Sequence, residues 1–380
     1  MKRTKICIVS PGYPSDGYPF YVFVKNLVNH LSTKGVDCYV FSPQSISKII
    51  IRGAKKSPVN ETQIFDKNPI FIYRPFFMSF SNSKILSAFS DFLLSKLFYK
   101  YLKSKNFKFD AIYCHFWQSA FISFKHAKKF NIPIFVACGE DKIPSFNRHK
   151  NSKLKLYNYL SGVICVSTKN QLESIEKGLT PRNKTIVIPN ATDLKLFNKT
   201  STPTLRKKLK INTDDFVVIF VGAFIKRKGI SVLDSALKFI NDDKIKCIYI
   251  GSGPYKPSYK NILFVGKVNN DDLPNYLSIA DVFILPTLSE GCCNSIIEAM
   301  ACELPIISSN RNFNFDILDK SNSILINPEN INEVVYSLNK LRSNKKLLKH
   351  LSIGSYNKSR SLGLDSRASK IIDFIKSKLN

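Results

Sequence analysis

The segment from Ala280 to Glu298 constrains the fold more than any other part of this chain. It begins with the apolar run Ala280–Pro286, which is rich in β-branched and aromatic residues and is typical of a buried parallel strand. A polar loop with Gly291 follows, and then apolar residues at helical spacing, so we expect Asn294 or Ser295 to cap a short helix. A strand that leads directly into a helix predicts an α/β fold.

Two glutamates of this segment are candidates for ligand binding. The N-terminus of a helix favours phosphate, and Glu298, about one turn further on, is placed to accept two hydroxyls of a ribose. Glu290 lies on the preceding loop, within reach of a sugar attached to that phosphate. The simpler alternative is an ordinary strand–turn–helix in which both acids face solvent, and spacing alone does not separate the two interpretations.

The chain has 380 residues, which is long for one core and natural for two domains. It starts with a predicted strand (5–10), helix (20–31) and strand (36–41), an order that suits a doubly wound domain, although the G-x-G-x-x-G fingerprint is absent. Segment 45–68 is polar and basic and is predicted to be a mobile insertion. A linker is expected near 198–212, where Thr, Ser, Lys and Pro cluster.

Composition excludes several protein classes. No run approaches 18 apolar residues, so a transmembrane helix is not expected, and the apolar run near the N-terminus is too short for a signal peptide. The nine cysteines include no C-x-x-C pair, and no Asp-x-Asp pair is present, so the sequence indicates no zinc site, no disulfide framework and no metal site. The reduced cytoplasm is the expected compartment.

The net charge of +29 predicts an anionic partner, although Lys-rich usage also arises from a biased genome. Residues 1–190 contain 29 Lys and Arg against 10 Asp and Glu. No nucleic-acid-binding module is recognisable, so we expect an anionic membrane surface and no nucleic acid. A predicted helix over 83–105 presents Leu86, Phe89, Leu93, Leu97 and Tyr101 among lysines. It is interpreted either as a bilayer-surface helix or as an ordinary core-facing helix.

Five motifs, in this order along the chain, carry a family resemblance. They are Ile188-Pro-Asn-Ala-Thr-Asp193, Val221-Gly222 with Lys228-Gly229, Gly251-Ser-Gly-Pro254, Ala280-Asp-Val-Phe-Ile-Leu-Pro286, and Glu290-Gly-Cys-Cys-Asn-Ser-Ile-Ile-Glu298 with the following Ala-Met-Ala. With them the chain resembles the glycosyltransferases of family 4, which are retaining enzymes. The resemblance implies the GT-B fold, two doubly wound Rossmann-like domains facing a cleft. We therefore expect an N-terminal acceptor-binding domain over 1–198, a nucleotide-sugar-binding domain over 199–355, and a C-terminal helix over 356–380 that packs back toward the first domain.

The resemblance also implies roles for matching residues. Glu290 would contact the transferred sugar, Glu298 would hold the ribose, and His115 matches the second His of the family's H-x-H strand end. The catalytic candidates are thus Glu290, His115 and Lys228. The donor-binding candidates are Glu298, Asn294, Ser295, Gly222, Lys228, Arg227, Gly291 and Gly253. The candidates on the acceptor side of the N-terminal domain are Gly12, Gly17, Cys138, Glu140 and Asp141.

Two departures from the family pattern affect these expectations. Ala223 replaces the Arg of the family's V-G-R, and Arg227 is a possible substitute for the missing cation. The family's H-G-x-D turn is here Cys138-Gly-Glu-Asp141, and a thiol is a poor hydrogen-bonding substitute for imidazole. Either Glu140 or Asp141 takes over the contact with the sugar, or the donor specificity differs.

The function implied is transfer of a sugar from a UDP- or GDP-sugar to a glycan or polyprenyl-diphosphate-linked acceptor, without a metal cofactor. The expected setting is bacterial cell-surface polysaccharide biosynthesis (capsule, O-antigen of lipopolysaccharide, or exopolysaccharide) at the inner face of the cell membrane. Two alternatives are a non-catalytic nucleotide-sugar-binding partner subunit of the same fold and a nucleotide-sugar epimerase.

Overall fold

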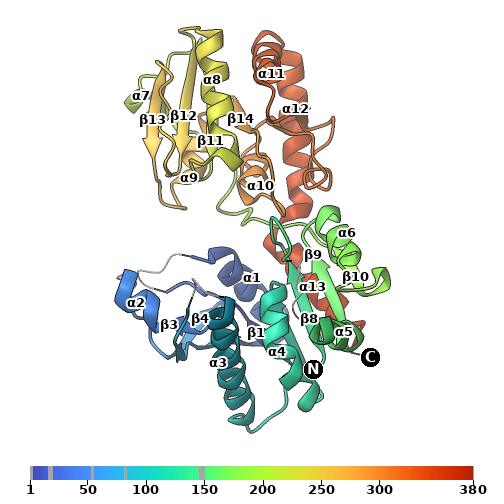
Figure 1. The fold of residues 1–380 in the computed structure, drawn as a ribbon. Helices are drawn as coiled ribbons and strands as arrows, with labels where there is room; N and C mark the ends of the chain where they lie inside the picture. Colours follow the sequence, from blue (N-terminus) through green and yellow to red (C-terminus); the bar gives the residue numbers. More distant parts are fainter. Residues whose placement is uncertain (1–2, 16–19, 53–54, 81–83, 145–149, 380) are drawn as a thin grey trace. The chain divides into compact units, whose positions relative to one another are not determined.

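The computed structural model of the chain describes residues 3–15, 20–52, 55–80, 84–144 and 150–379. The chain divides into two compact α/β units, each with its own sheet (Figure 1). Unit 1 comprises residues 1–166, 170–188 and 364–380, and unit 2 comprises residues 167–169 and 189–363.

Unit 1 is built on an eight-stranded sheet with the order β10-β9-β8-β7-β1-β2-β5-β4. Its strands are β1 (Thr4–Val9), β2 (Val36–Phe41), β4 (Asn60–Phe65), β5 (Asn68–Tyr73), β7 (Ala111–His115), β8 (Ile134–Cys138), β9 (Gly162–Cys165) and β10 (Thr185–Val187). Every pair is parallel except the edge hairpin β4–β5. A separate two-stranded pair joins β3 (Gln44–Ser45) to β6 (Phe76–Phe77).

Helices cover both faces of this sheet, because its central strands, such as β7 and β8, are buried on both sides. They are α1 (Val22–Thr33), α2 (Ile46–Arg52), α3 (Lys84–Lys103), α4 (Trp117–Lys129), α5 (Lys150–Tyr159), α6 (Thr168–Glu176) and α13 (Leu364–Lys376). The C-terminal helix α13 packs against α1, and its Ile371 and Ile375 are buried in the unit 1 core. Arg367 of α13 also donates a hydrogen bond from Nη1 to the Ile188 carbonyl oxygen at 2.6 Å. The C-terminal helix therefore returns to the N-terminal unit.

The prediction of a mobile insertion over residues 45–68 was wrong. The segment contains α2 and the edge strand β4, whose six residues all pair with β5. Asp66 and Lys67 form the hairpin turn with positive φ angles of 45° and 65°. The segment is polar because β4 is an edge strand whose residues alternate between exposed and half-buried positions, so polarity did not indicate a loop.

Unit 2 contains a fully parallel six-stranded sheet with the order β13-β12-β11-β14-β15-β16. Its strands are β11 (Phe216–Val221), β12 (Ile245–Ile250), β13 (Ile262–Gly266), β14 (Val282–Leu285), β15 (Ile306–Ser309) and β16 (Ser323–Ile326). Its helices are α7 (Pro203–Lys208), α8 (Ile230–Ile240), α9 (Leu273–Ser278), α10 (Asn294–Ala301), α11 (Ile331–Ser343) and α12 (Lys345–Ser359). In chain order the strands are arranged 3-2-1-4-5-6, the order of the Rossmann fold.

The boundaries between the units differ from the predicted positions at 198/199 and 355/356. Unit 2 begins at Pro189, because Asn190 donates hydrogen bonds from Nδ2 to the Cys292 carbonyl oxygen at 3.0 Å and to Asn294 Oδ1 at 2.8 Å. Unit 2 ends at Gly363, because the backbone N–H of Thr192 binds the Leu362 carbonyl oxygen at 3.0 Å. The polar stretch near 200 therefore lies inside unit 2 and includes α7.

Candidate active site

The candidate donor residues lie at the topological switch point of the unit 2 sheet. From β11 the chain proceeds to β12 on one side, whereas β14 proceeds to β15 on the other side. Ligands of doubly wound sheets bind at the carboxyl ends of the strands where this reversal occurs. The loop that contains Lys228 follows β11, and the loop that contains Glu290 follows β14. Two segments about sixty residues apart in the sequence are thereby placed side by side.

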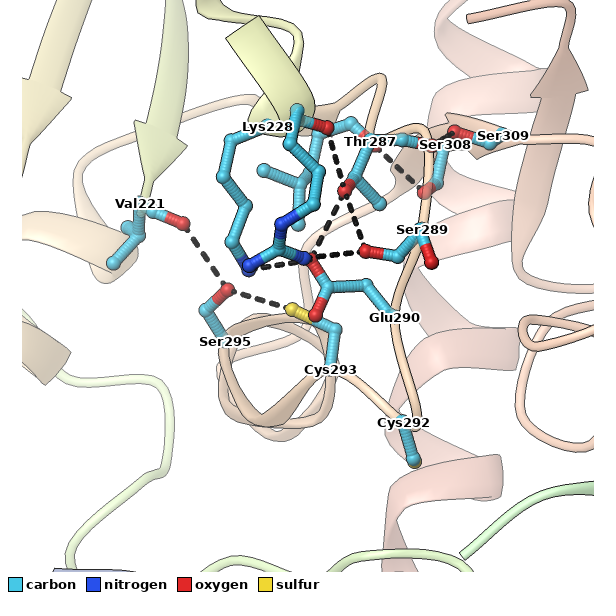
Figure 2. A network of polar contacts seen from close by, with 12 residues as sticks. Val221, Lys228, Thr287, Ser289, Glu290, Cys292, Cys293, Ser295, Ser308 and Ser309 are labelled. Carbon is cyan, nitrogen blue, oxygen red and sulfur yellow. Dashed lines mark hydrogen bonds and ion pairs between the residues drawn. The ribbon is translucent and has the colours of Figure 1, made fainter. Parts of the chain in front are cut away.

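One carboxylate oxygen of Glu290 accepts hydrogen bonds from three side chains (Figure 2). Glu290 Oε1 accepts hydrogen bonds from Lys228 Nζ at 2.5 Å, Thr287 Oγ1 at 2.9 Å and Arg227 Nη1 at 3.2 Å. Arg227 Nη1 also donates to the Ser289 carbonyl oxygen at 2.5 Å. We call Glu290, Lys228, Arg227 and Thr287 the Glu290 cluster. Adjacent residues Arg227 and Lys228 both reach Glu290 from a tight 3₁₀ turn over Lys226–Lys228.

The Glu290 cluster is largely shielded from water. The side chains of Glu290 and Lys228 are 11% and 14% exposed, whereas that of Arg227 is 36% exposed. Burial alone lowers the pKa of Lys228, but the neighbouring Cys293 and Glu290 outweigh it and the net pKa is raised. Lys228 therefore carries its positive charge at physiological pH. Burial raises the pKa of the Cys293 thiol.

Backbone contacts fix the loops of this cluster. The Leu288 N–H donates to the Arg227 carbonyl oxygen at 2.8 Å, and Ser295 Oγ on α10 donates to the Val221 carbonyl oxygen at 3.1 Å. Gly229 has a φ of 74°, and a Cβ there would lie 2.0 Å from the Pro286 carbonyl oxygen. A glycine is therefore required where the β11 and β14 loops cross.

Glycines also fix the loop after β12. A Cβ on Gly253 would lie 2.5 Å from the Phe224 carbonyl oxygen, in the segment that follows Gly222 and Ala223. Gly222 itself has room for a Cβ, with its nearest neighbours at 3.6 Å. Gly291 is buried in the β14–α10 loop.

The predicted cap of α10 was wrong. The helix begins at Asn294, and the N-cap position is occupied by Cys293, whose backbone is extended and whose side chain makes no capping hydrogen bond. Asn294 does not serve as the cap because its Oδ1 accepts a hydrogen bond from Asn190 Nδ2. Ser295 instead binds β11, as described above. No side-chain oxygen of the described residues therefore caps α10, and its N-terminus lies beside the Glu290 cluster (Figure 2).

Glu298 on α10 has a carboxyl group without a hydrogen-bond partner in the described part of the chain. Its side chain is half-buried and makes no hydrogen bond or ion pair with any described residue. Burial raises its pKa to about 7. A carboxyl group in this condition costs stability unless a ligand satisfies it, which makes Glu298 a candidate binding residue.

In unit 1, His115 ends β7 beside β1, the strand from which the sheet order reverses. It is 4% exposed, and within the described ranges its Nε2 has no hydrogen-bond partner. Burial, and then the charge of Arg367, lower its pKa to about 3, so the imidazole is neutral at physiological pH. Gly12 lies in the loop after β1, where a Cβ would be 2.3 Å from the Tyr21 ring. Gly17 lies outside the described residues.

The structure places Cys138, one of the acceptor-side candidates, in the core of unit 1. It is the last residue of β8, is completely buried, and its thiol lies 3.5 Å from Ser174 Oγ on α6. Glu140 is also occupied within unit 1, because its Oε1 accepts the backbone N–H of Trp117 at 2.9 Å at the start of α4, and burial raises its pKa. Asp141 is exposed. The departure at Cys138 therefore changes the core and not a ligand-facing surface.

Sequence reasoning missed Thr287 and Asn190. Thr287 follows Pro286 directly after β14, and a polar residue at the carboxyl end of a predicted strand could have been named as a site candidate. Among the described residues, no group of three or more His, Cys, Asp and Glu side chains is placed to hold a metal ion. No described helix is both long enough and apolar enough to span a bilayer.

Models of two protein families match the two halves of the chain. The model of glycosyl transferases group 1 matches residues 201–358, and that of Glycosyltransferase Family 4 matches residues 22–196. This chain belongs to glycosyltransferase family 4. It is a glycosyltransferase, with relatives in bacterial polysaccharide and glycolipid biosynthesis.

Two relatives and one solved structure illustrate the likeness of this glycosyltransferase. It is 26% identical to the putative teichuronic acid biosynthesis glycosyltransferase TuaC of Bacillus subtilis, over 86% of each chain. It is also 26% identical to the UDP-Gal:alpha-D-GlcNAc-diphosphoundecaprenol alpha-1,3-galactosyltransferase of Escherichia coli, over 66% of this chain and 70% of that one. The structure of Anabaena HepE in complex with UDP superposes with a TM-score of 0.74 at 16% identity, covering 98% of this chain and 100% of HepE. The fold is GT-B.

Proposed function

We propose that this glycosyltransferase transfers a sugar, with retention of anomeric configuration, from a UDP- or GDP-sugar to a glycan or polyprenyl-diphosphate-linked acceptor. The process would be bacterial cell-surface polysaccharide synthesis. The observation that carries the proposal is the placement of Glu290, which binds Lys228, and of Glu298 on one strand–loop–helix segment at the unit 2 switch point. The names of TuaC and of the E. coli galactosyltransferase support the acceptor class, and HepE with UDP supports a nucleotide donor.

In this proposal each end of the segment binds one part of the donor. Glu298 accepts hydrogen bonds from the ribose hydroxyls, which gives its unpartnered carboxylate the donors that the protein does not provide. The N-terminus of α10 and the cations Lys228 and Arg227 bind the diphosphate. Glu290 contacts the transferred sugar and holds both cations in position.

The reaction breaks the bond between the anomeric carbon and the diphosphate, so positive charge develops on the sugar and negative charge on the leaving phosphate. Lys228 and Arg227, already fixed by Glu290, stabilise the leaving phosphate without reorganisation. Arg227 thereby supplies the positive charge that is missing because Ala223 replaces the Arg of the family motif. We propose attack from the same face, with the leaving phosphate taking the acceptor's proton, and with no metal cofactor. Activity that EDTA abolishes and Mg²⁺ restores would contradict the last point.

His115 is proposed to contact the reacting sugar. Its neutral imidazole has one nitrogen without a partner, so it offers a hydrogen bond without adding a positive charge near the anomeric carbon.

We also propose that the protein is a peripheral protein of the inner face of the cell membrane. On α3, Phe89 and Phe92 are 49% and 52% exposed, and the exposed lysines Lys96, Lys100 and Lys103 continue at helical spacing. The C-terminal half of the helix also packs into the core, since Phe98 is buried. In this proposal the N-terminal half of the helix, with Phe89 and Phe92, contacts the bilayer surface. Binding to vesicles of 30% phosphatidylglycerol in phosphatidylcholine should weaken in Phe89→Ser and at high salt; no binding by the native protein would refute this part.

The test of the proposed function is a thermal-shift series with UDP- and GDP-sugars, followed by transfer assays with the donor that stabilises the protein. The matched variant is Glu298→Ala, which should abolish the donor's stabilising shift. The control is Glu329→Ala, an exposed acid of unit 2. A donor shift that survives Glu298→Ala would contradict the site.

A further inference from the structure

A second concave site lies in unit 1, at the carboxyl ends of three adjacent strands. A cavity of about 90 Å³ opens beside the loops that follow β1, β2 and β5. Its lining includes Gly12, Tyr13, Gln44, Lys55, Arg74 and Phe77, and we call it the Arg74 pocket. Carboxyl ends of parallel strands are where doubly wound domains bind ligands, so the position itself is appropriate for a substrate.

Arg74 follows β5 directly and is 2% exposed. Its Nη1 donates to Glu61 Oε2 at 2.5 Å and its Nη2 donates to the Pro14 carbonyl oxygen at 3.1 Å. Its Nε, in contrast, has no hydrogen-bond partner in the described part of the chain. A buried guanidinium N–H without an acceptor is unfavourable unless a ligand or an ordered water supplies one.

Tyr13 supplies a second unsatisfied donor in the same pocket. It is 2% exposed, its ring lies 5.8 Å from the Arg74 guanidinium carbon, and its hydroxyl has no partner among the described residues. Burial raises the pKa of Tyr13, so the phenol remains protonated and its hydroxyl can donate a hydrogen bond.

The chemistry of the lining indicates the class of ligand. Lys55 is exposed and adds a positive charge to that of Arg74, and no acidic residue lines the pocket in the described ranges. The counterion Glu61 is bound to Nη1 of Arg74, and Nε keeps no hydrogen-bond partner among the described residues. The rings of Tyr13 and Phe77 provide apolar surface of the kind against which sugar rings pack. Gln44 is satisfied by Ser57 and by the Arg74 carbonyl oxygen, so it shapes the pocket.

We propose that the Arg74 pocket binds an anionic group, a carboxylate or a phosphate, on the acceptor saccharide. This inference rests on the proposed function, because it deepens the acceptor class named there. Arg74 Nε and the Tyr13 hydroxyl donate to the anion, Lys55 adds charge at the mouth, and the aromatic rings contact the sugar.

The test uses the whole chain and the Arg74 Nε–H resonance in ¹H–¹⁵N spectra, assigned by its loss in Arg74→Lys. The probes are methyl glucuronide, glucose 1-phosphate, methyl glucoside and inorganic phosphate. We expect the resonance to shift with one or both anionic sugars at concentrations at least tenfold lower than with methyl glucoside. A response to the uronide alone identifies a carboxylate, and a response to the sugar phosphate alone identifies a phosphate.

The deciding variant is Tyr13→Phe, since it removes only a hydroxyl that has no partner and should leave thermal stability unchanged. It should weaken binding of the anionic sugar about tenfold, the loss typical of one hydrogen bond to a charged group. Tyr113→Phe is the matched control, because the Tyr113 hydroxyl is also buried and unpartnered but does not line the pocket. Its binding should equal that of the native protein.

The inference is overturned if neither anionic sugar binds better than methyl glucoside, if only inorganic phosphate binds, or if Tyr13→Phe binds normally. These outcomes are distinct from failure of the proposed function. Donor binding by Glu298 and sugar transfer are measured by assays that do not use the Arg74 Nε–H resonance. Transfer to an uncharged acceptor would therefore refute the proposed anion site and leave the transferase assignment intact.

Discussion

The raised pKa of the Glu298 carboxyl group predicts that the stability of the protein depends on pH. Burial raises its pKa from the ordinary 4.5 to about 7. The folded state therefore holds this proton more tightly than the unfolded state, and folding loses stability as the pH rises from 4.5 to 7. Above pH 7 the full pKa shift corresponds to a loss of about 3 kcal/mol in the free energy of unfolding, and partial exposure of the side chain reduces this loss to roughly 1–3 kcal/mol.

Replacement by the neutral isostere, Glu298→Gln, removes this cost. We expect its free energy of unfolding to exceed that of the native protein, with an advantage that grows by about 1–2 kcal/mol between pH 5 and pH 8. The measurement must report on unit 2, and Trp117, the single tryptophan, lies in unit 1. Hydrogen–deuterium exchange of β11 and β14 peptides over a urea series gives the required free energies.

Glu329→Gln is the control for this experiment, since the exposed carboxylate of Glu329 remains in contact with water. Its stability relative to the native protein should not change with pH. The reasoning is refuted if Glu298→Gln has the same advantage at pH 5 and pH 8, or if it is less stable than the native protein at pH 8. The variant should still bind nucleotide more weakly, because a charged acceptor for the ribose is lost.

Three further predictions concern catalysis. Glu290→Gln should slow single-turnover transfer about 100-fold and change donor affinity less than threefold, since the lost charge holds two cations at the leaving group. A variant that binds donor more weakly but transfers at the native rate would contradict this role. Lys228→Ala should lower kcat about 100-fold and Arg227→Ala about tenfold, because Lys228 is the more buried of the two; the reverse order would show that Arg227 carries the leaving charge. His115 has a pKa of about 3, so its titration should not affect kcat near pH 6.5. The pH profile of kcat in that range should therefore have the same shape in His115→Asn as in the native protein.

Strongly periodic local features were predictable from sequence. The predicted strand 36–41 coincides with β2, and the apolar run 280–286 contains β14, because β-branched and aromatic residues are typical of buried parallel strands. The candidate residues of unit 2 could be selected from sequence because Glu290, Glu298 and Lys228 lie in motifs whose order along the chain is itself informative. Polarity misled at 60–65, since an edge strand tolerates the same residues as a loop.

Other features had no local signal. β8 is apolar on both faces, so no alternation showed that the Cys138 side chain points into the core. The cap of α10 was mispredicted because Asn294 is engaged by Asn190, a residue 104 positions earlier. Residue preference at a helix start cannot account for a competing partner so far away in sequence.

Sequence alone determined the alternation of strands and helices, the family, and the residue types available for donor chemistry, because these depend on local patterns and on motif order. Tertiary structure decided how the residues meet. Reversal of strand order between β11 and β14 brings Arg227 and Lys228 to Glu290, and burial leaves Arg74 Nε and the Tyr13 hydroxyl without hydrogen-bond partners among the described residues. The physical reason is that hydrogen-bond satisfaction and desolvation depend on neighbours distant in the chain, which only the folded arrangement specifies.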